Sequence, residues 1–457
     1  MKSRKDSSND FIELNSYIRE LEMKNKELVK DNAELARRLD SKRYKAVDLV
    51  VDSAYSLARK TNNKRLLIKR NLNNTTSPKK KEKSRKTING RIDIININFY
   101  DWDGKTLYKG GAERYVFDLA CLLKKKGFSP RILQCSNTPF EKKYNGIEII
   151  GIGGGSKSDM RKDSFLFSRY CHDAELIIAS PLELASEIYD IPVIGINHGI
   201  NFDGDWNHYN KKYLPDYSIY IDSLKNVKSC VCVDTNFINW TRTVDYESSL
   251  KEKFIPNYYD EEQFKVSTKK GDGKKVTFVY PRRIYNARGA DITIEAFDKL
   301  LSDYNDKVVI RFVGQVDNEE IGKKLETFMN KYPKNVFHEE YDMKDMHKAY
   351  EGADVVLVPT RYCEGTSLSC IEGMVSGATI ITTNVGGLPN LVIDGFNGRL
   401  ISPTTEELYL AAKDLIEHPK ERERMAKNGR TVAESAFSKS NWNEKWEDEI
   451  NRVLKKK

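Results

Sequence analysis

Two glutamates stand eight positions apart at the ends of the segment EGTSLSCIE, Glu364 and Glu372. The apolar run 353–359 before them is typical of a buried strand, and a helix pattern begins near Thr366 or Ser367, both favourable N-cap residues. Glu364 is therefore expected on a strand-to-helix loop, with Glu372 about two turns into the helix. The free N–H groups of a helix start suit a phosphate, whereas carboxylates accept hydrogen bonds from hydroxyls. Such a loop predicts a ligand with both groups, such as a nucleotide sugar, although glutamates at this spacing also occur by chance on solvated helices.

A cluster of arginines follows a second strand-like run. The segment 280–289, YPRRIYNARG, lies between strand-like residues 275–279 and a helical pattern that begins at Ala290. Arg283 and Arg288 on this loop can hold a diphosphate through bidentate, charge-assisted hydrogen bonds. The alternative is a solvated basic loop, which is common in a chain with a formal net charge of +9.

Two further loops follow predicted strands. The loop after the apolar run 92–99 contains Gly110 and Gly111, ahead of an amphipathic helix predicted over 112–126. Paired glycines before a helix let the backbone approach a ligand closely. His198 follows another apolar strand, at the end where ligands bind in α/β sheets. The alternative for the glycine pair is an ordinary turn between a strand and a helix. The alternative for His198 is a half-buried histidine bonded to a neighbouring carbonyl.

In this order, the motifs resemble those of the retaining GT-B glycosyltransferases of glycosyltransferase family 4. The resemblance runs from about Ile92 to the C-terminus and is sharpest from Val276 to Leu400. The matching residues are Gly110-Gly111, His198-Gly199, Ile255-Pro-Asn257, Arg283, Arg288-Gly289, Glu364 with Glu372, Ser376-Gly377, Gly386-Gly387-Leu-Pro389 and Asp394 to Gly398. The chain departs from the family pattern at four places. Arg282 replaces a glycine, Arg288 a lysine, Gly373-Met-Val an Ala-Met-Ala and Asn390 a frequent glutamate.

The resemblance implies two doubly wound, Rossmann-like α/β domains that face each other across a cleft. It implies that Glu364 orients hydroxyls of the donor sugar, that His198 contacts this sugar near the reacting carbon, and that Glu372 accepts from the ribose. The candidate catalytic residues are Glu364, His198, Arg283 and Arg288. The candidate donor-binding residues, which hold the diphosphate and ribose, are Gly110, Gly111, Thr366, Ser367, Leu368 and Glu372.

The expected function is transfer of a hexose-type sugar, with retention, from a nucleoside-diphosphate sugar to a saccharide or lipid-linked saccharide in bacterial surface polysaccharide synthesis. A UDP-sugar is the favoured donor, and no cofactor or metal is expected because arginines and a helix N-terminus supply positive charge. The pairs Asp101/Asp103 and Asp203/Asp205 have the spacing of a metal-holding motif, but we expect them to line the acceptor cleft or lie on the surface. The alternatives are a non-catalytic sugar-nucleotide-binding scaffold subunit and a nucleotide-sugar epimerase.

The N-terminal residues have a different pattern. Leucines recur every seven residues, at Leu14, Leu21, Leu28 and Leu35. With Asn25 and Asn32 at the a positions, this pattern predicts a parallel two-stranded coiled coil over 11–39 and hence a homodimer. The alternative is a lone amphipathic helix on the globular part of the chain.

The organisation expected along the chain is a coiled-coil dimerisation helix (1–60), a basic disordered linker (61–90), an acceptor domain (91–262), a nucleotide-sugar domain (263–435) and a final helix that crosses back to the first domain (436–457). The linker suits an anionic membrane surface or is simply solvated, and no nucleic-acid-binding motif accompanies its charge. Seven scattered cysteines favour reduced thiols, and no apolar run predicts a signal peptide or membrane helix. These features predict a cytoplasmic protein, with the linker as a candidate contact to the inner face of the membrane.

Overall fold

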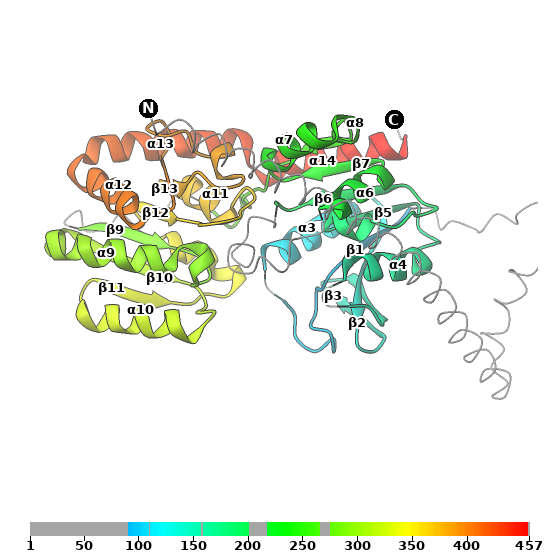
Figure 1. The fold of residues 1–457 in the computed structure, drawn as a ribbon, viewed down its shortest axis with the longest axis horizontal. Helices are drawn as coiled ribbons and strands as arrows, with labels where there is room; N and C mark the ends of the chain where they lie inside the picture. The colour runs from blue at the N-terminus through cyan, green and yellow to red at the C-terminus, as the bar shows by residue number, and fades with distance from the viewer. Residues whose placement is uncertain (1–89, 109, 157–158, 201–216, 266–274, 456–457) are drawn as a thin grey trace, which may run out of the picture. The chain divides into compact units, whose positions relative to one another are not determined.

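The computed structural model describes residues 90–108, 110–156, 159–200, 217–265 and 275–455. All of them belong to one compact unit, Arg85–Lys457, and they form two β-sheets covered by helices (Figure 1). The predicted coiled coil, nearly all of the predicted basic linker and the Asp203/Asp205 pair lie outside the described residues.

Within the described residues the first sheet has eight strands in the order β3-β4-β2-β1-β5-β6-β7-β8. Every neighbouring pair is parallel except β3 with β4. Because β1 lies between β2 and β5, the direction of strand succession reverses beside β1, which is where ligands bind in doubly wound sheets. The strands are β1 (Arg91–Asn96), β2 (Ser129–Ser136), β3 (Phe140–Tyr144), β4 (Ile147–Gly153), β5 (Leu176–Ser180), β6 (Val193–Asn197), β7 (Ser229–Cys232) and β8 (Glu252–Phe254).

Helices lie between most of these strands, although β2, β3 and β4 follow one another directly. The helices are α3 (Gly111–Lys125), α4 (Met160–Tyr170), η2 (Leu182–Ala185), α6 (Ser218–Asn226), α7 (Thr235–Val244) and α8 (Tyr246–Ser249). The amphipathic pattern predicted for α3 is confirmed, since Tyr115, Leu119, Leu122 and Leu123 are all buried. The N-cap of α3 is Gly110, so the paired glycines begin the helix rather than precede it.

Six described strands form the second sheet, in the all-parallel order β11-β10-β9-β12-β13-β14. This is the dinucleotide-fold order 3-2-1-4-5-6. The strands are β9 (Val276–Tyr280), β10 (Val308–Val313), β11 (Val336–Glu339), β12 (Val355–Val358), β13 (Thr379–Thr383) and β14 (Arg399–Ile401). The helices are η3 (Asn286–Arg288), α9 (Ala290–Tyr304), η4 (Asn305–Lys307), α10 (Glu319–Lys331), η5 (Met343–Tyr350), α11 (Leu368–Val375), η6 (Leu388–Asn390), α12 (Thr405–Glu417) and α13 (Pro419–Ala436).

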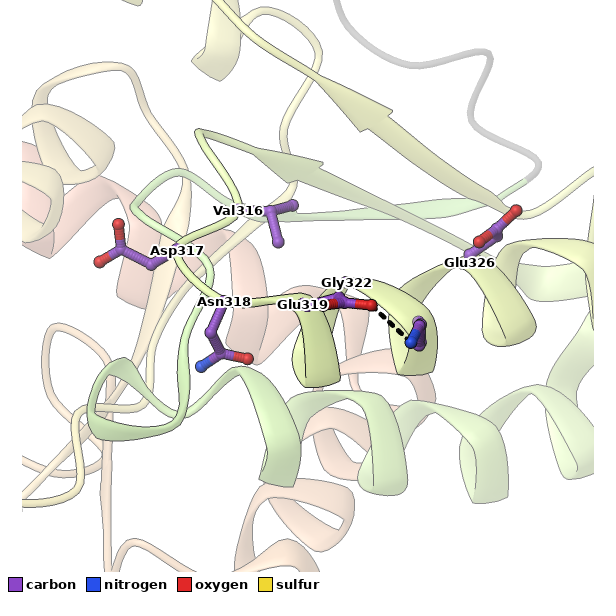
Figure 2. Close-up of a pocket in the computed structure, with 7 residues that line it drawn as sticks. Val316, Asp317, Asn318, Glu319, Gly322 and Glu326 are labelled. Atoms are coloured by element: carbon purple, nitrogen blue, oxygen red, sulfur yellow. Dashed lines mark ion pairs between the residues drawn. The ribbon is translucent and has the colours of Figure 1, made fainter.

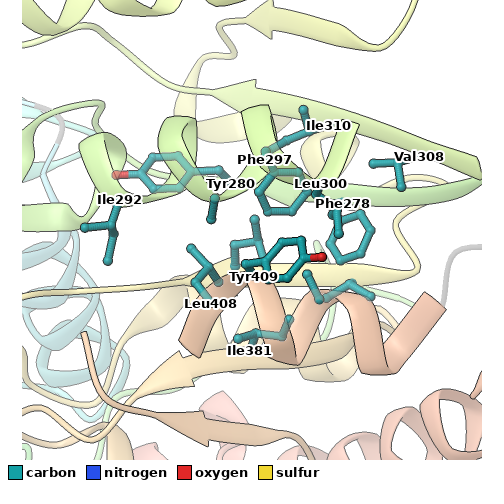
Figure 3. Packing of buried hydrophobic residues seen from close by; sticks show 14 of the residues in the cluster. Phe278, Tyr280, Ile292, Phe297, Leu300, Val308, Ile310, Ile381, Leu408 and Tyr409 are labelled. Carbon is teal, nitrogen blue, oxygen red and sulfur yellow. The ribbon is translucent and has the colours of Figure 1, made fainter. Parts of the chain in front are cut away.

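Both faces of the second sheet are buried, as the continuous apolar run of β12 predicts. Val355 and Leu357 pack into a cluster with side chains of α9 and α12. Figure 3 shows other members of this cluster, among them Phe297 of α9 and Leu408 of α12. Their neighbours Val356 and Val358 pack into a second cluster, with side chains of α11. The alternation follows from the period of two in a strand. Packing on both faces fixes the position of β12 and of the loop that leads from β12 to α11.

The last helix, α14 (Lys439–Leu454), packs on the first sheet rather than the second. Trp442, Trp446 and Ile450 are buried in the cluster that contains residues of β1 and α3. The indole Nε1 of Trp446 donates a hydrogen bond to the hydroxyl of Tyr115 at 2.8 Å. The chain therefore passes to the second sheet and returns to the first.

The two crossings lie side by side. Tyr258 packs in the core of the first sheet and Tyr259 in the core of the second. The amide of Tyr259 donates to the carbonyl of Phe437 at 2.9 Å, and the amide of Lys439 donates to the carbonyl of Tyr259 at 3.0 Å. We call the described part of residues 90–258 together with α14 the first lobe, and the described part of 259–437 the second lobe. The predicted α/β class with two doubly wound sheets is confirmed.

Candidate active site

A cavity of about 550 Å³ is bordered by both lobes, at the carboxyl ends of strands of both sheets. Ligand sites in doubly wound sheets occur at this end of the strands. Every sequence-predicted site residue except Thr366 lines the cavity: Gly110, Gly111, His198, Arg283, Arg288, Glu364, Ser367, Leu368 and Glu372. Further lining residues that the sequence analysis did not select include Arg114 and Arg282.

Strand pairing explains why arginines and a glutamate meet here. The strand β9 lies beside β12, with Val279 opposite Val356, although these two residues are far apart in the chain. The loops after the two strands are therefore neighbours. The first loop supplies Arg282 and the second supplies Glu364, at the point where the strand order of the second sheet reverses.

Glu364 is held by one of its two oxygens. Its Oε2 accepts hydrogen bonds from Arg282 Nη2, from Arg288 Nη1 at 2.6 Å and from Thr360 Oγ1 at 2.9 Å. Burial acts to raise the pKa of Glu364, but the charges of Arg288 and Arg282 outweigh it, so the pKa is lowered. Within the described part of the chain no hydrogen bond reaches Oε1. The residue is thus an ionised carboxylate in a fixed orientation, with one oxygen open to a ligand hydroxyl.

Arg282 and Arg283 have different environments. The Arg282 side chain is 8% exposed and pairs with Glu364, and its Nε is buried with no hydrogen-bond partner among the described residues. The Arg283 side chain is 60% exposed, lies over the ring of Tyr285 and reaches Asp317 at 3.3 Å. Sequence reasoning selected Arg283 and passed over Arg282, because a double arginine does not reveal which side chain turns inward. The signal that could have found Arg282 is its replacement of a glycine in the family pattern.

The helix α11 spans Leu368–Val375 with Ser367 as its N-cap, so the predicted start near Thr366 or Ser367 is confirmed. Glu372 is therefore its fifth residue, about one turn from the start rather than two. Thr366 does not cap the helix with its side chain, because its hydroxyl donates to the carbonyl of Val233 at 2.7 Å and accepts from the amide of Asn257 at 2.9 Å. Thr366 thus joins the two lobes instead of lining the cavity.

Glu372 has a partner for each oxygen. Oε1 accepts from Arg114 Nη1 at 2.8 Å and Oε2 accepts from the hydroxyl of Tyr350 at 2.8 Å. Burial raises the pKa of Glu372, and the charge of Arg114 and the bond from Tyr350 offset this only in part. The second terminal nitrogen of Arg114, Nη2, is buried with no hydrogen-bond partner among the described residues. An unpaired buried donor costs roughly 1–3 kcal/mol, and more where the group is charged.

His198 borders the cavity from the first lobe. Its Nε2 lies 2.9 Å from the hydroxyl of Ser180, and the ring of Tyr115 meets the imidazole edge-on with centroids 5.2 Å apart. Burial lowers the pKa of His198 to about 4, so the ring is neutral near pH 7. It can therefore offer hydrogen bonds and a ring edge to a ligand, but no positive charge.

Close contacts surround the cavity, some between the lobes and some within the second lobe. Asn390 accepts from the amide of Thr235 at 3.0 Å and donates to its hydroxyl at 2.6 Å. A Cβ on Gly365 would lie 2.8 Å from the carbonyl oxygen of His198, and one on Gly386 would lie 2.1 Å from the carbonyl oxygen of Glu364. Neither position has room for a side chain, so the backbone beside Glu364 and His198 is closely packed.

Another hollow, of about 500 Å³, lies at the start of α10. Figure 2 shows that the polar side chains around it project in different directions and do not converge on one point. Asn318 caps α10 by accepting from the amide of Ile321 at 2.8 Å. Glu319 and Lys323 form an exposed ion pair one helical turn apart. These residues stabilise the helix and do not suggest a site.

The DxD pair at Asp101 and Asp103 lies on a loop of the first lobe. Asp101 accepts from the amides of Lys105 at 2.6 Å and Thr106 at 2.9 Å, and Asp103 accepts from the side chain of Asn137 at 2.7 Å. Both carboxylates thus stabilise exposed turns, and neither lines the cavity. In the described ranges, no group of three or more His, Cys, Asp or Glu is placed to hold a metal ion. None of the described helices has the length and hydropathy to cross a membrane.

Comparison with known proteins adds a family to this geometry. Residues 260–432 match the family described as Glycosyl transferases group 1. Alpha-1,3/1,6-mannosyltransferase ALG2 from Dictyostelium discoideum is 24% identical over 297 residues, which are 59% of this chain and 66% of that protein. The chain spans 45% or less of three other curated relatives that it matches.

Solved structures resemble the chain over most of its length. Sucrose-phosphate synthase from Thermosynechococcus elongatus superposes with a TM-score of 0.63 at 16% identity, covering 80% of this chain and 100% of that one. Anabaena HepE in complex with UDP gives a TM-score of 0.61 at 15% identity, covering 79% and 100%. At these identities the likeness concerns the fold, which is GT-B. The chain thus has a GT-B fold, and its second lobe matches the family model described as Glycosyl transferases group 1.

Proposed function

We propose that the chain is a retaining glycosyltransferase that moves a hexose-type sugar from a nucleoside-diphosphate sugar, with a UDP-sugar favoured, to a saccharide or lipid-linked saccharide. The observation that carries the proposal is the arrangement of Glu364, an ionised carboxylate with one open oxygen, beside Arg282, Arg283 and Arg288 in a cavity between two doubly wound lobes. The second lobe matches a glycosyltransferase family, and HepE, which shares the fold, was solved with UDP.

The diphosphate would bind at the start of α11. The helix N-terminus presents the amides of Ser367 and Leu368 to the cavity, and the exposed guanidinium of Arg283 can swing onto a phosphate from its weak contact with Asp317. Arg288, which pairs with Glu364, adds positive charge beside this site. These groups would stabilise the negative charge that grows on the leaving phosphate, which lowers the barrier rather than merely binding the donor.

The donor sugar would lie between Glu364 and His198. Oε1 of Glu364 would accept from sugar hydroxyls, and the neutral imidazole of His198 would contact the sugar near the reacting carbon. In the proposed reaction the bond between the anomeric carbon and the phosphate oxygen breaks, and a bond to the acceptor oxygen forms on the same face. The acceptor's proton passes to an oxygen of the departing phosphate, so no separate base and no metal are required.

The proposed setting is bacterial surface polysaccharide synthesis. The support is the basic linker predicted over 61–90, which suits a cytoplasmic enzyme that works on lipid-linked acceptors at an anionic membrane. The predicted coiled coil over 11–39 would make the enzyme a homodimer. Sedimentation at micromolar concentration tests this part, and a monomer would contradict it.

The test of function is donor turnover. The purified protein, with EDTA present, is incubated with UDP-, GDP-, ADP- and dTDP-sugars, with and without membrane extract as acceptor, and nucleoside diphosphate release is followed by mass spectrometry. Release from one donor that is lost in Glu364→Ala would support a metal-independent transferase, and an anomeric analysis of the product decides between retention and inversion. Nucleotide binding without release under any condition would favour the scaffold alternative, and an isomerised nucleotide sugar would favour the epimerase.

A further inference from the structure

One ion pair crosses between the lobes inside the cavity. Arg114 is the fourth residue of α3 in the first lobe, and its Nη1 lies 2.8 Å from Oε1 of Glu372 in the second lobe. The side chains are 13% and 5% exposed. A buried ion pair is stable only where further hydrogen bonds satisfy both partners, because each charge has lost its water.

Only one partner of this pair is fully satisfied. Glu372 receives the hydroxyl of Tyr350 on its second oxygen, whereas Nη2 of Arg114 is buried without a hydrogen-bond partner among the described residues. Arg114 also lies within reach of the aromatic ring of Phe264, with its guanidinium carbon 5.9 Å from the ring centroid. Buried donors in folded proteins are nearly always paired. The unpaired Nη2 belongs to a residue that lines the cavity, so it marks a place for a ligand acceptor.

The position of this donor restricts the acceptor. Nη2 belongs to the same planar guanidinium as Nη1, so it lies next to the carboxylate oxygen that Nη1 binds. A ligand group that fits between them must both donate to Oε1 of Glu372 and accept from Nη2 of Arg114. A hydroxyl does both, whereas a phosphate oxygen only accepts.

Resting on the proposed function, we propose that Arg114 is a donor-binding residue of the first lobe that holds the ribose diol jointly with Glu372 of the second lobe. The two hydroxyls donate to Glu372 and accept from Nη2 of Arg114. The ribose then forms hydrogen bonds with both lobes, so binding of the diol also stabilises the contact between the lobes. A nucleotide that lacks the diol gains neither contact.

The test compares ligands as well as variants. Isothermal titration measures the affinity of the full-length protein for whichever of UDP, GDP or ADP binds most tightly, and for its 2′,3′-dideoxy form. We expect the wild type to prefer the ribose form by about tenfold or more. In Arg114→Met this preference should fall to about threefold or less, and Arg114→Lys, which keeps the charge but loses the planar fork, should lie between them.

Arg399→Met is the matched control, because Arg399 forms an ion pair with Asp414 at 2.8 Å and does not line the cavity. This variant should retain the full ribose preference. A full preference in Arg114→Met, or in Arg114→Lys if the methionine variant does not fold, would overturn the inference. Equal binding of the ribose and dideoxy forms by the wild type would also overturn it while leaving the proposed function intact. Failure of the wild type to bind any of the three nucleotides would contradict the proposed function itself.

Discussion

Glu364 and Glu372 come from one short segment, yet the structure gives them opposite environments. All described partners of Glu364 belong to the second lobe and meet on one oxygen, and its pKa is lowered. Glu372 is bound on both oxygens, one of them by Arg114 of the first lobe, and burial raises its pKa. All described hydrogen-bond partners of the Glu364 carboxylate therefore come from the second lobe, whereas the Glu372 carboxylate has partners from both lobes.

This difference separates two kinds of function within one motif. A carboxylate that its own lobe orients is suited to act on the reacting sugar, whose position must be fixed before chemistry. A carboxylate whose partner lies on the opposite lobe forms its ion pair only when the two lobes are in contact, so it is suited to couple ligand binding to that contact. The comparison predicts that changes at the first residue affect turnover most, and that changes at the second affect donor affinity and stability.

The largest expected effect is on turnover at Glu364. Glu364→Gln keeps the shape but removes the ionised oxygen that would accept from the sugar, so we expect kcat to fall about 10³-fold, or ~4 kcal/mol. Steady-state kinetics with the identified donor measures it. A rise in KM with unchanged kcat would show that Glu364 contributes to donor affinity, as Glu372 is expected to, and would contradict the proposed difference between the two residues.

Arg283→Ala should come next. The side chain is 60% exposed, so its removal should leave the fold intact. In the proposed mechanism, the growing charge on the leaving phosphate would lose a partner. We expect a barrier increase of ~2–4 kcal/mol in kcat. Arg430→Ala is the control, because Arg430 is another exposed arginine, pairs with Glu434 and does not line the cavity. Near wild-type turnover in Arg283→Ala would contradict the proposed role of Arg283 in stabilising the leaving phosphate.

Glu372→Gln tests the second half of the comparison. It leaves the charge of Arg114 buried without its carboxylate, so the free energy of unfolding should fall by roughly 3 kcal/mol and the donor KM should rise about tenfold. Urea denaturation and kinetics measure the two effects. If kcat fell as far as in Glu364→Gln while KM stayed constant, the two glutamates would share one role.

The smallest effect concerns Asp234, a buried carboxyl of the first lobe. Its Oδ1 caps α7, its Oδ2 has no partner among the described residues, and burial raises its pKa to about 6. The folded state therefore holds this proton more tightly than the unfolded state, so the associated stability is present near pH 4 and is lost as the pH rises through about 6.

Asp234→Asn keeps a good N-cap but cannot ionise. Relative to the wild type it should be roughly 1–3 kcal/mol more stable near pH 7 and nearly unchanged near pH 4. Thermal or urea unfolding at several pH values measures the difference. A difference that does not change with pH would show that Asp234 has no raised pKa. The charge of Glu364 contributes to this raised pKa, so Glu364→Gln should shrink the effect.

Much of the fold could be predicted from sequence because it follows local patterns. The apolar run before Glu364 became β12, and the amphipathic stretch after Gly110 and Gly111 became α3. Placement of the site loops followed from a general rule, since parallel strands carry ligand sites at their carboxyl ends. The helix start near Thr366 or Ser367 was predicted correctly, but Glu372 lies about one turn from it rather than two. Thr366 does not act as the cap, because its hydroxyl bonds across to the first lobe.

What could not be predicted depends on side-chain direction and on contacts between lobes. The sequence does not say that Arg282 turns inward while Arg283 turns outward. It does not say that Arg114 reaches Glu372, because 258 positions separate them and neither lobe alone brings them together. Asn390 is a similar case, since its departure from the family pattern is explained only by its bonds to Thr235.

The last helix has a consequence for synthesis. The core of the first lobe includes Trp442, Trp446 and Ile450, which follow the whole second lobe in the chain and therefore leave the ribosome after it. Domains usually fold in the order in which they are made, the N-terminal one first. Here the second lobe can finish while the first still exposes the apolar surface that α14 will cover. The half that is made first is completed last, and a chain stopped short of Trp442 would leave it open.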